Sequence, residues 1–383
     1  MLDIGVSYDG SWQKRGHASH NGTGTVIELL TGLPVDFEVL SNFCQKCKMA
    51  EQNEEDTDNW MVKHKENCPK NFDGTSNAME VECAVRLWRR SIEKLKLRYT
   101  VMLCDGDSKA YDKISEMEIY GREKQVAKEE CINHVSKRMG TALRKLIETS
   151  KARGESVSGR GKLTQEKVTK IQNYYGRAIK DNTSDLSVLK QRIYAILFHL
   201  CSSDAHPKHI HCPPGAKSWC FWQRDIAMKR VPGEHKEHDT LPAEVGKKLV
   251  PIFERLSDEN LLKRCVRGKT QNPNESFHGL IWKFCPKTIF NGRKVIETAV
   301  NLAACQFSMG STFKILLCHM LKIAPLQNML TSANEKSANR VKLAQKARSC
   351  ASKKKRKHLK YRCINLDKSK KQVEGVTYAA GNF

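Results

Sequence analysis

The first forty residues contain three short runs of apolar or alternating side chains, at Ile4–Tyr8, Thr23–Leu30 and Leu33–Leu40. Runs of this length, bounded by glycine or polar turns, are typical of β-strands. Gly32 lies between the second and third runs, where a tight hairpin needs a flexible residue. The pattern therefore predicts one strand followed by a β-hairpin.

The pattern then changes to helical spacing. From Met79 to Leu97 the apolar side chains recur every three to four residues, which predicts an amphipathic helix. Tyr99–Leu103 is a fourth strand candidate and runs directly into Cys104–Asp107. Residues 121–200 are mostly helical in pattern, and Lys294–Leu330 is the most apolar helical block. This order predicts a mixed sheet with helices rather than an all-helical protein.

Composition narrows the class of protein. The chain has 383 residues, 39% of them hydrophobic, which is too apolar for wholly disordered protein and enough for one large domain or two ordinary ones. A run of about 18 apolar residues is missing, so we expect no membrane span. Met1–Tyr8 also lacks the features of a secretion signal. The net charge of +24 indicates a polyanionic partner, and nucleic acid is the usual one.

Fifteen cysteines, an odd number, occur in this chain, and several lie beside histidines. In a chain without a secretion signal this favours zinc over disulfides. Cys44 and Cys47 form a CxxC pair, and His64 and Cys68 form an HxxxC pair. Together they predict a closed, four-ligand structural zinc site in a segment too polar to fold alone. The alternative is an exposed loop with unpaired thiols.

A second group of cysteines and histidines is spread more widely. The expected ligands of a second zinc site, joining a helical insertion to the core, are Cys131, His134, Cys212 and Cys220. Either His209 or His211 is a substitute for one of them. The alternative is that His134 caps a helix and Cys131 belongs to the core.

Three acids are candidates for catalysis. Asp9 is expected at the end of one strand, Asp105 after another, and Glu275 at the opening of a helix. Carboxylates placed in this way can converge and hold two Mg²⁺ or Mn²⁺ ions, which promote phosphoryl transfer. Taken singly, a strand-ending aspartate is more often a turn former. Asp107 is the alternative to Asp105, and Asp3 is a poorer alternative to Asp9.

The motifs around these acids, taken together and in order, resemble the Mutator-like DDE transposase family. The motifs are Asp9-Gly-Ser-Trp with a later Gly-His, Cys-Asp105-Gly-Asp-Ser, Cys131-Ile-Asn-His134, and Thr270-Gln-Asn-Pro-Asn-Glu275-Ser276. In that family a CxxH motif follows the second acid, as Cys131 follows Asp105 here. The resemblance extends from about Val6 to about Leu330.

This resemblance implies an α/β fold: a ribonuclease-H-like mixed sheet with flanking helices, a mostly helical insertion and zinc-binding knuckles. The implied parts are residues 1–120, the first part of the core with a zinc knuckle at 44–71; 121–265, a basic helical insertion with a Cys/His cluster; 266–330, the last core helices; and 331–383, a basic and partly disordered tail.

The resemblance also implies a DNA transposase that cuts transposon ends and joins them to target DNA. Asp9, Asp105 and Glu275 would be its catalytic metal ligands, and such enzymes act as dimers or larger assemblies. A second hypothesis is a domesticated or truncated relative that binds DNA and zinc without catalysis. The second hypothesis is favoured by the eight residues that precede Asp9, since they lead us to expect no DNA-binding domain before the first acid. A third is a non-enzymatic RNA- or chromatin-binding protein.

Basic and aromatic residues complete the candidates. Four are expected on a helix after the CxxH motif, where they would contact DNA phosphates or form a solvated face: Lys137, Arg138, Arg144 and Lys145. Trp219 and Trp222 flank Cys220 and would stack on a base or pack around a metal. Lys353–Lys357 suits import into the nucleus, or is a solvated charge run.

Overall fold

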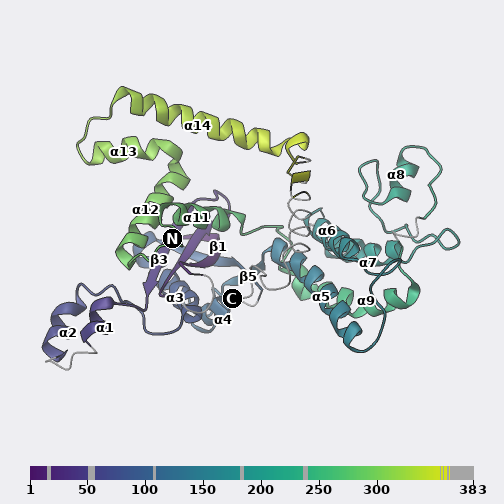
Figure 1. Cartoon of the computed structure of the whole chain (residues 1–383), viewed down its shortest axis with the longest axis horizontal. Helices are drawn as coiled ribbons and strands as arrows, with labels where there is room; N and C mark the ends of the chain where they lie inside the picture. The colour runs from purple at the N-terminus through teal and green to yellow at the C-terminus, as the bar shows by residue number, and fades with distance from the viewer. Residues whose placement is uncertain are drawn as a thin grey trace, which may run out of the picture. The chain divides into compact units, whose positions relative to one another are not determined.

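The structure is a computed structural model that describes residues 1–14, 19–50, 57–106, 109–181, 185–235 and 240–353, together with residues 355, 356, 358, 359 and 362. It divides into two compact units, Met1–Ala303 and Ala304–Phe383 (Figure 1). None of the described helices is long and apolar enough to cross a membrane.

A five-stranded mixed sheet forms the first part of unit 1. Its strands are β1 (Leu2–Trp12), β2 (Asn21–Glu28), β3 (Pro34–Ser41), β4 (Leu97–Cys104) and β5 (Ala127–Glu130). Their order across the sheet is β3-β2-β1-β4-β5. β2 is antiparallel to both β1 and β3, whereas β4 is parallel to both β1 and β5. The expected mixed sheet with helices is confirmed, and all four predicted strands are present.

Two details of the sheet differ from expectation. β1 extends to Trp12, so Asp9 lies inside the strand, paired with Thr25, rather than at its end. β5 was not predicted, because Ala-Lys-Glu-Glu lacks the apolar alternation that marks a strand. The sheet therefore extends into the part of the chain that we expected to be a helical insertion.

Helix α3 (Ser76–Leu95) covers one face of the sheet, next to α4 (Lys109–Glu116) (Figure 1). Its Trp88 is fully buried and meets the rings of Tyr8 and Tyr99 edge to face, at centroid distances of 5.8 and 5.2 Å. The backbones come close as well. A Cβ atom on Gly24 of β2 would lie 2.5 Å from Cβ of Cys83 on α3.

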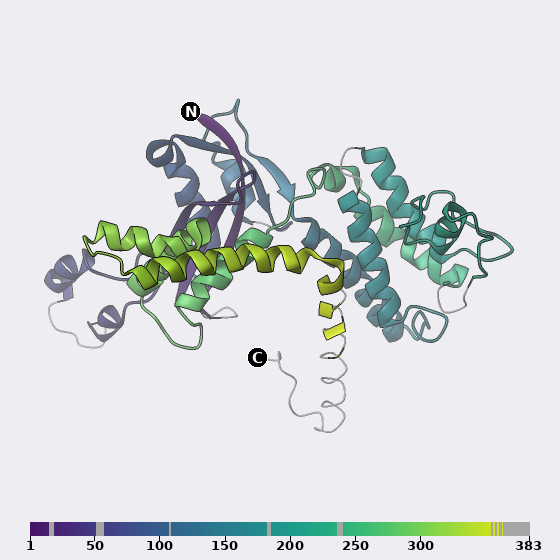
Figure 2. The same ribbon diagram turned by 90° about the horizontal axis from the view of Figure 1, so that it is seen from above.

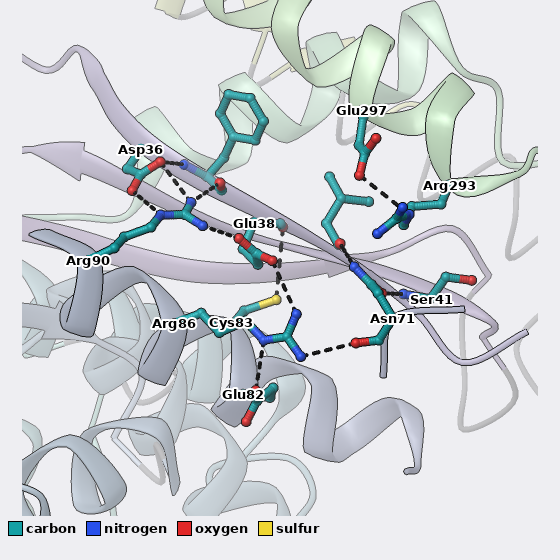
Figure 3. Close-up of polar contacts among 12 residues, drawn as sticks. Asp36, Glu38, Ser41, Asn71, Glu82, Cys83, Arg86, Arg90, Arg293 and Glu297 are labelled. Carbon is teal, nitrogen blue, oxygen red and sulfur yellow. Dashed lines mark hydrogen bonds and ion pairs between the residues drawn. The ribbon is translucent and has the colours of Figure 1, made fainter. Parts of the chain in front are cut away.

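Ion pairs hold α3 along β3 (Figure 3). The Arg90 guanidinium binds both oxygens of Asp36, at 2.8 and 2.9 Å, and also contacts Glu38. One turn earlier, Arg86 pairs with Glu82 at 2.7 Å and with Glu38 at 3.4 Å. Paired guanidinium forks fix orientation as well as position, so the central turns of α3 have a defined place beside the sheet.

Residues after β5 fold into a helical bundle with its own core (Figure 2). The helices in this region are α5 (Ile132–Ala152), α6 (Gln165–Asp181), α7 (Leu186–Leu200), α8 (Phe221–Ala227), α9 (Ala243–Leu256) and α10 (Glu259–Lys263). Leu143, Tyr175, Ile193 and Phe253 are buried together in its core. Backbone hydrogen bonds tie the start of the bundle to the sheet, because the Cys131 N–H donates to the Cys104 carbonyl.

The chain then returns to the sheet with α11 (Asn272–Phe284) and α12 (Arg293–Met309). In unit 2 the structure describes a short 3₁₀ turn η1 (Gly310–Thr312), α13 (Phe313–Met320) and α14 (Gln327–Arg348). Much of α14 therefore lies within residues 331–383, where we expected a partly disordered tail.

Candidate functional site

The first two acids are brought together by the parallel pairing of β1 with β4. Ser7 is in register with Leu103, so Asp9 and Asp105, each two residues further along, lie at the same end of the strand pair. Asp105 follows β4 directly. Asp3 lies at the opposite end of β1, where it pairs with Arg98. The geometry therefore favours Asp9 over Asp3 as the partner of Asp105.

Glu275 is placed by the first turn of α11. The side-chain amide of Gln271, the residue before the helix, donates to the Tyr8 carbonyl at 2.8 Å. The Asn274 amide donates to the Ser7 carbonyl at 3.2 Å. Both acceptors are backbone atoms of β1 next to Asp9. These buried hydrogen bonds hold the start of α11, and with it Glu275, beside the strand.

Asp9 is surrounded by negative charge. Burial raises the pKa of its carboxyl group to about 7, with further contributions from Glu80, Glu275 and Asp105. These electrostatic contributions show that the three predicted acids share one neighbourhood. They also add a fourth carboxylate, that of Glu80.

Glu80 was missed by the sequence analysis. It lies in the first turns of α3, and a Cβ atom on Gly10 would be 3.1 Å from its Cγ. Burial and the nearby Asp105 raise the pKa of Glu80. A signal was present in the sequence, because Glu80 shares a helical face with Ala84 and Trp88, both fully buried. An acid on the apolar face of a helix is unusual.

His278 lies one helical turn after Glu275. Its Nδ1 is 3.5 Å from Oδ2 of Asp9, and its Nε2 is 2.8 Å from the Thr25 hydroxyl. Burial lowers the pKa of His278 to about 3, so the imidazole is neutral. It therefore does not neutralise the charge of Asp9.

Asp105 has a different environment. Its Oδ1 accepts a hydrogen bond from the Gly106 N–H at 2.7 Å, and its Oδ2 lies 3.0 Å from Nδ1 of His134. A guanidinium nitrogen of Arg138 is 3.7 Å away. Burial alone would raise the pKa of Asp105, but the Gly106 N–H, followed by His134 and Arg138, lowers it overall. The CxxH histidine thus contacts a candidate catalytic acid.

The three acids do not form a closed cluster. In the part of the chain that the structure describes, the carboxylate oxygens of Asp9, Asp105 and Glu275 do not all lie within 4.8 Å of one another. Asp105 faces His134, and Asp9 faces His278. Asp107, the alternative to Asp105, lies outside the described residues.

A basic groove begins at Asp105. It has a volume of about 770 Å³, and its lining includes Lys137, Arg138 and Lys145 of α5. These are three of the four predicted DNA-binding residues; the fourth, Arg144, is exposed on α5 but is not part of this lining. Arg255 at the end of α9 also lines the groove and was not predicted.

The structure gathers Cys44, Cys47, His64 and Cys68, and we call these four residues the knuckle cluster. Short helices α1 (Gln45–Ala50) and α2 (Thr57–Lys65) carry or flank them. All four ligand atoms lie within 4.8 Å of one another, with Cys44 Sγ 3.2 Å from His64 Nε2 and the Sγ atoms of Cys47 and Cys68 3.5 Å apart. Tetrahedral zinc places such ligand pairs about 3.6 and 3.8 Å apart. The knuckle cluster can therefore hold zinc.

A second group consists of His199, His209, Cys212 and Cys220, and we call it the insertion cluster. All four are buried, and their ligand atoms also lie within 4.8 Å of one another, so this cluster too can hold zinc. The expected set is corrected here. Cys212 and Cys220 are present, and His209, one of the substitutes, replaces one ligand.

Cys131 and His134 lie elsewhere. The Cys131 sulfur accepts a hydrogen bond from the Gln271 N–H at 3.4 Å, and His134 contacts Asp105. His211, the other substitute, is outside the insertion cluster. His199 was not predicted, because it lies at the end of the apolar helix α7, without a nearby cysteine at motif spacing. Cys131 and His134 were expected to be ligands because of their CxxH spacing.

The fold and its sites define a mixed α/β protein with a carboxylate-rich strand end, a basic groove and two Cys/His clusters. A family model for Mutator-like transposases matches residues 1–220, more than half of the chain. The chain belongs to the Mutator-like transposase family. No curated protein matches it, and no solved structure does. The matched region holds Asp9, Asp105 and both clusters, and it ends before Glu275.

Proposed function

We propose that this protein is a metal-dependent DNA transposase with a ribonuclease-H-like core, in which Asp9, Asp105 and Glu275 are the catalytic acids. One observation carries the proposal. Within a chain of the Mutator-like family, two parallel neighbouring strands place Asp9 and Asp105 at the same end, and α11 is fastened to β1 beside them.

The donor set suits a hard divalent cation. The three acids offer only carboxylate oxygens, which are the protein ligands that Mg²⁺ and Mn²⁺ prefer. The raised pKa of Asp9 reflects burial next to other carboxylates, and a divalent cation would favour its ionised form. Ions of this kind, when bound, activate a nucleophilic oxygen and stabilise a leaving oxygen in phosphoryl transfer.

The chain's own residues position the acids and the DNA. His134 and the Gly106 N–H orient the Asp105 carboxylate, while the neutral His278 and Thr25 support Asp9 from the other side. The basic groove that begins at Asp105 suits a phosphodiester backbone. Strand cleavage by water at a transposon end, and then attack of the new 3′-hydroxyl on target DNA, would use this one site.

A cleavage assay tests the proposal. The purified chain, incubated with labelled DNA and Mg²⁺ or Mn²⁺, should nick DNA, and Asp9→Asn or Glu275→Gln should abolish nicking while DNA binding is retained. Asp3→Asn is the matched control, because Asp3 is an acid of the same strand paired with Arg98 and Lys124. If both active-site variants cut normally, the catalytic assignment is wrong. If the unaltered chain binds DNA but never cuts it, the non-catalytic relative becomes the better hypothesis.

The proposal extends to location and assembly. A transposase acts on chromosomal DNA, and the basic run at 353–357, partly outside the described residues, would direct import into the nucleus. We also propose that it acts as a homo-oligomer. Fluorescence microscopy with and without that run, and light scattering of the purified chain, test these two points.

A further inference from the structure

The insertion cluster has the dimensions of a tetrahedral metal site. The Nδ1 atoms of His199 and His209 are 3.1 Å apart, and the sulfur atoms of Cys212 and Cys220 lie 3.9 and 3.5 Å from Nδ1 of His209. Zinc at ordinary bond lengths places two nitrogens about 3.3 Å apart, and a nitrogen and a sulfur about 3.6 Å apart. Two imidazoles and two thiols also match the ligand preference of zinc.

We propose that the insertion cluster is a closed structural zinc centre, and that Asp204, His235 and Ser202 position its ligand His209. This inference does not depend on the catalytic assignment. It gives a role to a hydrogen-bonded network that lies outside the acidic site and its groove and runs from the buried His209 to Asp204, whose side chain is 57% exposed.

A chain of hydrogen bonds runs outward from His209. Its Nε2, on the side away from the cluster, is 2.9 Å from Nε2 of His235 and 3.0 Å from the Ser202 hydroxyl. The same His235 nitrogen is 2.8 Å from Ser202. The other nitrogen of His235, Nδ1, is 2.5 Å from Oδ1 of Asp204. Ser202 and His209 are buried, and the His235 side chain is only 5% exposed.

The direction of these bonds fixes which nitrogen of His209 is free to bind metal. Asp204 accepts the Nδ1–H of His235, so in the neutral imidazole Nε2 of His235 is an acceptor. His209 can then donate its Nε2–H to that acceptor, which leaves a lone pair on Nδ1 facing the cluster. Metal-bound histidines ordinarily donate their other N–H to such a partner.

Aromatic side chains close the site. The ring of Trp222 stacks on His209 at a centroid distance of 5.1 Å, and the ring of His235 lies edge to edge with His209, with centroids 5.0 Å apart and planes 21° apart. Trp219 stacks on Tyr174 of α6 at 4.2 Å, which joins the cluster to the bundle. Of the two roles considered for the tryptophans, the structure supports packing around a metal site.

The surrounding segment has little else to hold it. Between the end of α7 and the start of α9, the buried apolar residues among those described are Cys212, Cys220 and Leu241. Ile210 and Val231 in the same segment are 84% and 91% exposed. A segment that buries so little apolar surface needs a metal to fold, and binding free energy then becomes folding free energy.

The test measures zinc in the full-length chain. With both clusters intact we expect two zinc ions per chain, and with Cys212→Ser plus Cys220→Ser we expect one. The affinity measurement uses a chain whose knuckle cluster is disabled by Cys47→Ser and Cys68→Ser. In that background, chelator competition should show that Asp204→Asn weakens zinc binding several-fold. This is less than the roughly 10- to 100-fold cost of losing a group bonded directly to a ligating histidine, because Asp204 acts through His235 and is 57% exposed.

Controls separate positioning from general stabilisation. Glu234→Gln removes an exposed carboxylate next to His235 and should leave the zinc affinity unchanged. Asp204→Glu should restore part of the lost affinity. With Co²⁺ in place of zinc, Asp204→Asn should shift the visible absorption bands, whereas the zinc-free variant should unfold at the same temperature as its zinc-free parent.

Two results would overturn the proposal. If the stoichiometry does not fall when Cys212 and Cys220 are replaced, the insertion cluster is not a zinc centre. If Asp204→Asn and Glu234→Gln give the same affinity and the same Co²⁺ spectrum, Asp204 does not position His209.

Discussion

Replacing Asp9 with asparagine should stabilise the fold while abolishing catalysis. The Asp9 carboxyl group is partly buried among Glu80, Glu275 and Asp105, and its pKa is raised from 3.8 to about 7. Asparagine has nearly the same shape and keeps an oxygen that can accept a hydrogen bond. It does not carry the charge that this environment disfavours.

The magnitude follows from the size of the pKa shift. One pKa unit corresponds to about 1.4 kcal/mol, so the shift sets an upper limit of about 4 kcal/mol on the cost of ionising Asp9 in the fold. The side chain is 29% exposed, and solvent screens part of this. We therefore expect Asp9→Asn to raise the free energy of unfolding by about 2 kcal/mol at pH 8.

The pH dependence has a definite sign. Between pH 3.8 and about 7 the folded state binds more protons at Asp9 than the unfolded state does. The stability contributed by Asp9 is thus fully present below the unfolded pKa, and it is lost as the pH rises through the folded one. The advantage of the asparagine variant should be near zero at pH 4 and complete at pH 8.

Urea unfolding in magnesium-free buffer measures this difference, without chelators so that the two Cys/His clusters are left undisturbed. Adding Mg²⁺ should stabilise the unaltered chain more than the variant, because ligand binding to the folded state adds to stability. A variant that is less stable than its parent at pH 8, or a difference that does not change with pH, would refute the reasoning.

Three further predictions follow from two close backbone contacts and from the lining of the basic groove. Gly24→Ala should destabilise the fold by about 1–3 kcal/mol in urea unfolding, because its Cβ would lie 2.5 Å from that of Cys83. Gly106→Ala should displace Arg138, because a guanidinium nitrogen of Arg138 lies 1.4 Å from the new Cβ position. If the substitution acts only through Arg138, the double variant Gly106→Ala/Arg138→Ala should cleave DNA no more slowly than Arg138→Ala alone. Arg255→Ala should weaken DNA binding several-fold, because Arg255 lines the basic groove. It should also reduce the slope of log K against log salt concentration by about the contribution of one phosphate contact, measured by fluorescence anisotropy.

The strands and the long helix were predictable because their periodicity is local. Ile4–Tyr8 and Tyr99–Leu103 are apolar enough to identify β1 and β4, and the apolar face of Met79–Leu97 identifies α3. β5 was not predictable, since its place in the sheet comes from pairing with β4 and not from its own side chains. Asp9 was placed at a strand end for a similar reason: Gly10 suggested a turn, but pairing with β2 continues to Trp12.

The site residues could also be predicted only where the pattern is local in the sequence. The residues of the knuckle cluster form two pairs, each close in sequence, so spacing alone was enough to predict that the four come together. The insertion cluster takes His199 from the end of a helix and its other three residues from the segment that follows, and only the tertiary fold brings His199 to Cys220. Glu80 reached the acidic site through the packing of α3 on the sheet, which no linear motif records.

Helix α5 explains why the CxxH motif lies with the acids and not with the insertion cluster. The helix begins immediately after Cys131, whose N–H is bonded to the end of β4. His134 and Arg138 are one turn apart and so face Asp105 together, while Lys145, on the same side, is about 16 Å further along the axis. One helix thereby brings an imidazole and a guanidinium to an acid at one end and presents positive charge along a groove at the other. The charge of this segment is consequently placed in line with the candidate catalytic site, as a strand of DNA passing through it requires.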